Sequence, residues 1–171
     1  MIKKIFIYFF LLVLTTNLNA AKKSKGSGVS GNEGEGEYIP KGPPPAKKYT
    51  LGFKEMKRGI KLEKKGKFNK AKSKYEKAIE YLLDSNSEDP MNPLTLNYLG
   101  FLYEKTDNFD YAEIYYRLGL EIEPKNYLIN MNLGKFYLKI NKKNKSIKIL
   151  EDLESCNCKE FFELKNFIQN K

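Results

Sequence analysis

The sequence predicts an all-α fold of three stacked helix pairs, because one spacing of small and large residues occurs three times. Its clearest copy spans residues 93–126, with small residues at Gly100 and Ala112 and a proline at Pro124. Small residues let two helices approach closely, and a proline ends the second helix. One helix pair cannot bury its apolar face alone, so neighbouring pairs are expected.

Matching residues appear 34 positions later and 41 positions earlier. The later copies are Leu133, Gly134 and Tyr137 for Leu99, Gly100 and Tyr103, and the earlier copies are Gly59, Phe68, Ala71, Tyr75 and Ala78 for Gly100, Phe109, Ala112, Tyr116 and Gly119. We therefore expect repeats at about 52–85, 93–126 and 127–155. Their helices are expected at about 52–65, 68–83, 93–106, 109–122, 127–140 and 143–154.

The middle repeat resembles the tetratricopeptide repeat (TPR). It reads Leu96-x2-Leu99-Gly100-x2-Tyr103, then Ala112-x3-Tyr116, then Pro124, and these residue types at these offsets are the signature of that family. The resemblance implies a right-handed TPR solenoid over residues 51–171. It also implies a non-catalytic protein that binds a protein or peptide partner.

A last amphipathic segment is expected to close the stack. Its apolar residues recur at helical spacing, and they are Phe161, Phe162, Leu164, Phe167 and Ile168. This pattern fits a capping helix at about 159–170 that covers the open end of the solenoid.

The first 50 residues have the composition of an export signal followed by a spacer. We predict a signal peptide over 1–20, because two lysines are followed by an apolar run over 5–14 and by a polar stretch that ends at Ala20. The alternative is an uncleaved segment that anchors the protein. Residues 21–50 are rich in Lys, Gly and Pro and predict a disordered linker. We therefore expect a periplasmic or secreted protein whose mature chain begins at Ala21.

The tail resembles that of short exported TPR proteins of Gram-negative bacteria, which often end in a cysteine pair followed by Glu-Glu-Tyr, an acidic residue and Leu, and then by Ile four residues later. The residues that resemble this pattern are Cys158, Glu160, Phe161, Glu163, Leu164 and Ile168. The chain departs from it at Lys159, at Phe161 in place of tyrosine, and in having only one residue between the cysteines. Exported proteins usually keep an even number of cysteines oxidised, although a bond across so short a loop is tight. We expect a disulfide between Cys156 and Cys158, with free thiols and an intermolecular bond as alternatives.

The composition argues against catalysis and against nucleic acid as a partner. The chain has no histidine, which removes the commonest general base and metal ligand. Its carboxylates show no spacing that enforces a paired acid–base site. The net charge is +10, but all basic residues except Arg58 and Arg117 are lysines, whereas nucleic-acid readers depend on arginine. We expect no enzyme activity, no cofactor and no metal.

The family resemblance places a partner-binding groove on the first helix of each pair. The groove residues are Phe53, Met56, Ile60, Leu94, Asn97, Phe101, Leu128, Met131 and Lys135. Exposed apolar residues of this kind mark binding surfaces, unless the linker folds over them. We expect charge substitutions at Met56, Phe101 and Met131 to abolish binding without unfolding the protein. Family members that hold an acidic peptide terminus use Lys, Asn and Arg here, so Met56, Ile60 and Leu128 make that ligand doubtful.

Lysines suggest a second way to bind a partner. Lys64, Lys105 and Lys139 occupy one position in the three repeats and are expected to form a basic rim beside the groove. Residues 127–150 also contain six lysines and no acid. The alternative function is therefore a basic, envelope-associated protein that binds anionic lipid or polymer at a membrane surface.

Overall fold

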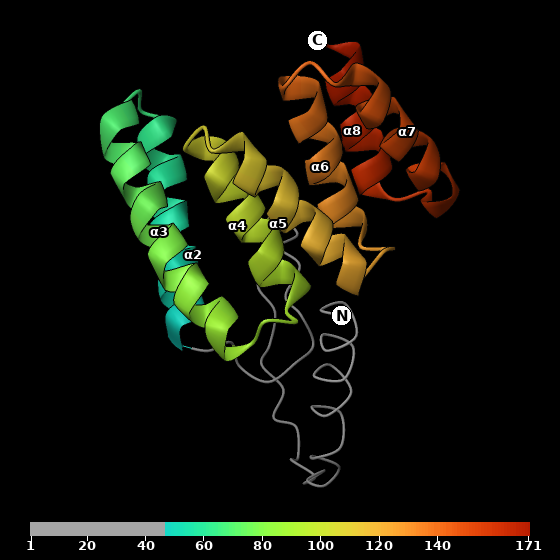
Figure 1. Ribbon diagram of the computed structural model, residues 1–171. Helices are drawn as coiled ribbons and strands as arrows, with labels where there is room; N and C mark the ends of the chain where they lie inside the picture. Colours follow the sequence, from blue (N-terminus) through green and yellow to red (C-terminus); the bar gives the residue numbers. More distant parts are fainter. Residues whose placement is uncertain (1–46) are drawn as a thin grey trace, which may run out of the picture. The chain divides into compact units, whose positions relative to one another are not determined.

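The computed structural model describes residues 47–171 and confirms an all-α solenoid of three helix pairs with a C-terminal capping helix (Figure 1). Residues 1–46, with the expected signal peptide and most of the expected linker, lie outside the described residues. The helices are α2 (Lys47–Glu63), α3 (Phe68–Glu88), α4 (Pro93–Lys105), α5 (Phe109–Ile122), α6 (Tyr127–Lys139), α7 (Lys143–Leu153) and α8 (Lys159–Gln169), and a 3₁₀ turn, η1, covers Glu154–Cys156. None of these helices is long and apolar enough to cross a membrane.

Consecutive helices pack against each other along the whole stack. The pairs are α2 with α3, α4 with α5, and α6 with α7, while α3 packs on α4 and α5 on α6. The turn inside each pair needs a left-handed residue, and the three repeats place Gly66, Asp107 and Asn141 there, with φ of 68°, 63° and 61°. Gly, Asp and Asn adopt this conformation at the lowest cost. The turn residues therefore repeat with the helices.

Two asparagines start the first helices of the second and third pairs. Asn92 accepts hydrogen bonds from the Leu94 and Thr95 backbone N–H groups, both at 3.1 Å, and Asn126 accepts one from Ile129 at 3.0 Å. These bonds satisfy N–H groups that have no partner inside the helix. These caps fix the helix starts at 93 and 127, which the repeat spacing predicted.

A glycine in the first helix of each pair lets the helix that packs on it come close. A Cβ atom on Gly59 would lie 2.4 Å from the Tyr75 ring, and one on Gly100 would lie 2.7 Å from the Tyr116 ring. In the third repeat the neighbour of Gly134 is Leu164 of α8, at 2.6 Å. The capping helix therefore covers the position that a tyrosine of the second helix fills in the first two repeats.

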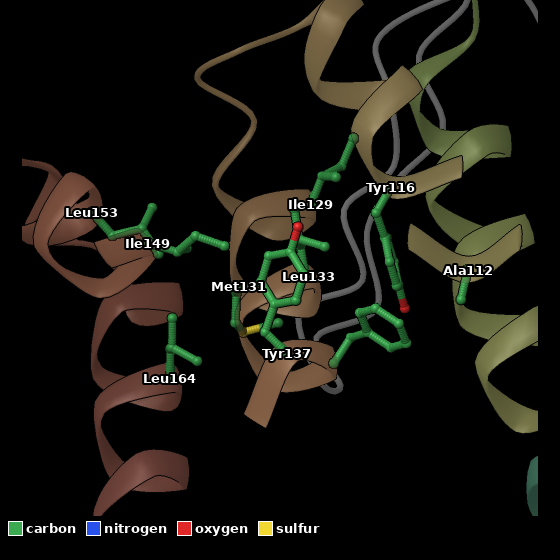
Figure 2. Packing of buried hydrophobic residues seen from close by; sticks show 10 residues of the cluster. Ala112, Tyr116, Ile129, Met131, Leu133, Tyr137, Ile149, Leu153 and Leu164 are labelled. Atoms are coloured by element: carbon green, nitrogen blue, oxygen red, sulfur yellow. The ribbon is translucent and has the colours of Figure 1, made fainter. Parts of the chain in front are cut away.

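Repeats two and three share one core with the capping helix (Figure 2). Each of these helices contributes a side chain that is at most 4% exposed, and they are Tyr116 of α5, Leu133 of α6, Leu153 of α7 and Leu164 of α8. A second cluster joins α2 and α3 to α4. Burial of these side chains supplies the main driving force for stacking.

Two helix ends lie outside the predicted bounds. α2 begins at Lys47, inside the stretch assigned to the linker, where Tyr49 stacks on Phe53 and Lys48 pairs with Asp84 at 2.6 Å. α3 continues five residues past its predicted end at 83, and Ser85 is buried there. Both extensions come from tertiary contacts, which local sequence patterns do not report.

The turn before the capping helix contains a disulfide between Cys156 and Cys158. Asn157, between them, has a left-handed φ of 46°, and Cys158 is the N-cap residue of α8. The Cys158 N–H also donates to the Cys156 sulfur at 3.3 Å. The bond therefore fixes the backbone at the point where α8 begins.

Candidate functional site

The predicted groove residues divide into a half-exposed and a buried group. Phe53, Ile60, Phe101, Leu128 and Lys135 keep part of their surface accessible. The other four are at most 7% exposed, and they are Met56, Leu94, Asn97 and Met131. The prediction that these four face a partner is wrong.

Their burial has a structural cause at three of the four positions. Met56 packs in the cluster of α2, α3 and α4, and Met131 packs in the cluster of α6, α7 and α8. Asn97 accepts a hydrogen bond from the Asn132 side-chain N–H at 3.0 Å, which joins α4 to α6. These side chains hold the first helices together, so charge at Met56 or Met131 would unfold the domain.

Aromatic rings dominate the surface between α2 and α4. We call Tyr49, Phe53, Tyr98 and Phe101 the aromatic platform, and all four are half-buried. The Phe53 ring lies 5.4 Å from the Tyr98 ring, and the Tyr49 ring lies 6.1 Å from it. The sequence analysis did not include Tyr49 among the groove residues, because Tyr49 lay in the expected linker. It also did not include Tyr98, although Tyr98 lies three residues before Phe101 and therefore on the same face of the helix.

Two lysines lie over this platform. Lys57 Nζ is 4.8 Å from the centre of the Phe53 ring, and Lys105 Nζ is 5.5 Å from the centre of the Phe101 ring. An ammonium group over an aromatic face is attracted by the ring. The platform therefore combines apolar area with positive charge.

The expected basic rim is largely neutralised. Lys105 pairs with Glu63 at 2.8 Å, and Lys139 lies 3.5 Å from Glu104, so each lysine meets a glutamate of the preceding repeat. Of the three, Lys64 alone has no ion pair within the described residues. Two of the three lysines of the expected basic rim therefore have their charge offset by a glutamate.

Each of these glutamates also accepts a hydrogen bond from a tyrosine. Tyr75 donates to Glu63, and Tyr116 donates to Glu104 at 3.4 Å. Burial alone would raise the pKa of Glu63, but the bonds from Lys105 and Tyr75 outweigh burial and lower it. The Tyr–Glu–Lys chain thus recurs between repeats one and two and between repeats two and three.

Three further lysines of the third repeat also form ion pairs with glutamates. Lys135 pairs with Glu163 of α8. Lys142 and Lys145 both reach Glu113 of α5, at 2.9 and 3.2 Å, and the Tyr137 hydroxyl donates to the same carboxylate at 2.9 Å. Burial acts to raise the pKa of Glu113, but these three donors lower it to about 2.

The Glu113 cluster gives a prediction for pH dependence. Because the folded-state pKa lies below that of an unfolded glutamate, this stabilisation is present above about pH 4.3 and is lost as pH falls toward 2. Glu113→Gln should therefore lower the melting temperature at pH 7 and flatten its fall between these values. Thermal melts at several pH values measure this, and Glu121→Gln on the same helix is the control. Parallel curves for wild type and Glu113→Gln would contradict the assignment.

Metal-ligating side chains do not gather anywhere in residues 47–171, where no group of three or more could hold an ion. A surface hollow of about 350 Å³ lies on α5, lined by Asp110, Glu113, Ile114, Arg117, Leu118 and Glu121. These lining residues are not arranged as an acid–base pair or as a site with a nucleophile. The aromatic platform remains the strongest candidate site.

Comparison with known proteins finds a family model that matches one of the three repeats. Residues 96–126 match the family model described as tetratricopeptide repeat. No curated protein matches the sequence. A similar solved structure is the first TPR of Spaghetti (RPAP3) bound to the HSP90 peptide SRMEEVD, with 22% identity, a TM-score of 0.50, and coverage of 71% of this chain and 94% of that chain.

Two further structures show weaker likeness. The second TPR domain of human RPAP3, in complex with the HSP70 peptide SGPTIEEVD, has 21% identity and a TM-score of 0.49 and covers 72% of this chain and 99% of that chain. The Arabidopsis OM64 TPR domain has 16% identity and a TM-score of 0.45, with coverage of 72% and 98%. The family match and the Spaghetti structure agree with the TPR solenoid described above.

Proposed function

We propose that this chain is an exported, non-catalytic interaction module that binds a protein or peptide in its concave groove. The observation that carries this proposal is the aromatic platform, where the Tyr49, Phe53 and Tyr98 rings lie together, Phe101 packs on the same cluster, and all four keep part of their surface accessible. Aromatic side chains offer large contact areas with few rotatable bonds, and they are enriched in protein interfaces. Half-exposed Ile60 and Leu128 add apolar area.

The groove favours an apolar or aromatic segment over an acidic terminus. The Spaghetti structure holds an acidic peptide, SRMEEVD. In this chain Met56 is buried, Ile60 and Leu128 are apolar, and Lys105 already pairs with Glu63. Partner binding therefore rests on apolar contact, and we expect it to persist at high salt, where charge pairing weakens.

The alternative is a lysine surface for anionic lipid or polymer, and half of the charge of that surface is offset by glutamates in the structure. Of the six lysines in residues 127–150, four pair with glutamates, and they are Lys135, Lys139, Lys142 and Lys145. Only Lys143 and Lys148 have no ion pair within the described residues. Because Lys142 and Lys145 share Glu113, three carboxylates offset three of the six positive charges, and half of the charge of this surface remains.

The groove can be tested by site-specific crosslinking. A photoreactive benzophenone is placed at Phe53 or Leu128, with Ile114 as the control, since Ile114 is 50% exposed on the outer helix α5. We expect the full-length protein to crosslink one envelope protein from Phe53 and Leu128, and we expect Phe53→Glu to abolish the product. Equal yields of the same product from Ile114 would show that the groove is not the binding surface.

Export is a separate part of the proposal. It rests on residues 1–20, which lie outside the described residues, and on the pattern of a charged start, an apolar run and a small residue. Mass spectrometry of the envelope fraction should find a mature amino terminus at Ala21. Retention of Met1 on a protein in the cytoplasmic fraction would contradict export and leave the groove proposal unchanged.

A further inference from the structure

The first helix of the stack carries a stripe of four cations, Lys54, Arg58, Lys61 and Lys65, which we call the N-terminal edge. These residues follow one another at intervals of four, three and four positions, so they lie on one face of α2 and the turn after it. All four are exposed. No ion pair joins Lys54, Lys61 or Lys65 to another described residue.

The same positions in the later repeats form the contact with the preceding repeat. In α4 and the residue after it they hold Thr95, Leu99, Leu102 and Thr106, which are 1%, 0%, 0% and 6% exposed. Leu99 and Leu102 pack in one cluster with Tyr75 and Leu82 of α3. In α6 and the residue after it they hold Ile129, Leu133, Phe136 and Ile140, of which the first three are at most 4% exposed. The N-terminal edge is therefore the inter-repeat face of α2, with no repeat packed on it in the described chain.

A hollow beside this edge has an apolar floor. Its volume is about 330 Å³, and it is lined by Arg58, Lys61, Leu62, Lys65 and Lys74. Glu55 pairs with Arg58 and with Lys74, the latter at 3.1 Å, and is itself buried. Four cations around one carboxylate leave a surplus of positive charge over half-buried Leu62.

The sign of the charge distinguishes this face from an ordinary solvated end. Terminal repeats need a polar outer face, but solubility is served by both signs interspersed. Here four positions that are apolar or uncharged in α4 and α6 all carry positive charge. A face of one sign with an apolar floor fits an occupant that brings carboxylates and apolar side chains together.

We propose that the N-terminal edge docks an acidic amphipathic helix of a partner protein, seated where a preceding repeat would otherwise lie. Glutamates of that helix pair with Lys61 and Lys65, and its apolar side chains cover Leu62. The stack already uses this chemistry, because Lys105 and Lys139 each meet a glutamate from the neighbouring repeat. The edge is distinct from the aromatic platform, so this inference does not depend on the proposed groove.

A designed peptide tests the proposal. The probe is a fluorescein-labelled helix of three Glu-Leu-Ala-Ala-Leu-Glu-Ala repeats, and the matched probe has Gln in place of every Glu. At about 50 mM salt, the full-length protein should bind the acidic peptide at least ~10-fold more tightly than the Gln peptide. Lys61→Glu with Lys65→Glu should weaken acidic-peptide binding by ~10-fold or more.

Lys143→Glu with Lys148→Glu is the matched control, because it makes the same change in net charge on exposed, unpaired lysines of α7. It should change the affinity by less than about twofold. Circular-dichroism melts should show both double variants folded, since all four positions are exposed. Equal weakening by the two double variants, or none from the edge variant, overturns the proposal. The proposal is also overturned if the edge variant binds the acidic peptide as tightly as wild type but no longer binds phosphatidylglycerol vesicles. That result would make the edge a lipid site.

Discussion

Phe136→Ala is expected to lower the free energy of unfolding by about 3–5 kcal/mol. Phe136 is fully buried, and its ring centre lies 5.9 Å from that of Tyr116, 5.8 Å from that of Tyr137 and 6.2 Å from that of Phe109. Removing the ring leaves a cavity between α5 and α6, which the surrounding aromatic rings cannot fill without leaving their own contacts. Domains of this size are stabilised by only about 5–15 kcal/mol, so the loss is a large fraction of the total stability.

Urea unfolding followed by circular dichroism measures this loss. Phe68→Ala is the matched control, because it deletes the same ring from a side chain that is 67% exposed. We expect it to cost less than about 0.5 kcal/mol. Similar losses in the two variants would show that α5 and α6 do not share the core described here.

Gly100→Leu is expected to destabilise the domain by about 3 kcal/mol, the upper end of the range for overpacking. A Cβ atom at this position would already lie 2.7 to 2.9 Å from three carbons of the Tyr116 ring. Tyr116 is 1% exposed and is held by its bond to Glu104, so the ring cannot turn aside into solvent. The larger side chain must therefore push α4 away from α5.

A double-mutant cycle isolates this contact. In a Tyr116→Ala background the ring is absent, so the further cost of Gly100→Leu should fall below about 1 kcal/mol. Thermal melts of the four proteins give the coupling. An undiminished cost in that background would mean that the clash is not with Tyr116, and the register of the repeat would need revision.

The sequence predicted the helix pairs well because one residue spacing recurs in three repeats, and local caps and turns fix the helix ends at the same places. Asn92 and Asn126 cap helices within three residues of themselves, and Gly66, Asp107 and Asn141 mark the turns. Five of the seven helices consequently end within one residue of the predicted bounds. The same local reasoning failed at α2 and α3, whose extra turns depend on contacts between helices.

The candidate site could be predicted only in part, because its chemistry is not local. Phe53, Ile60 and Phe101 are half-exposed in the structure, but nothing in the register distinguishes them from buried Met56 and Met131. The partner of Lys105 lies 42 residues away in the sequence. Lysines counted without their partners predicted a positive rim, whereas the fold brings a carboxylate to most of them.

The unlike ends of the stack limit how copies of the protein can associate. Solenoids that bury a complementary apolar face at each end can join head to tail, and such heterologous contacts continue without closing. Here Leu164 of α8 already occupies the position beside Gly134 at one end. The other end presents Lys54, Arg58, Lys61 and Lys65 where an apolar seam would be needed. Head-to-tail joining of the described stack is therefore disfavoured, because α8 covers one end and the other end has charged side chains in place of an apolar seam.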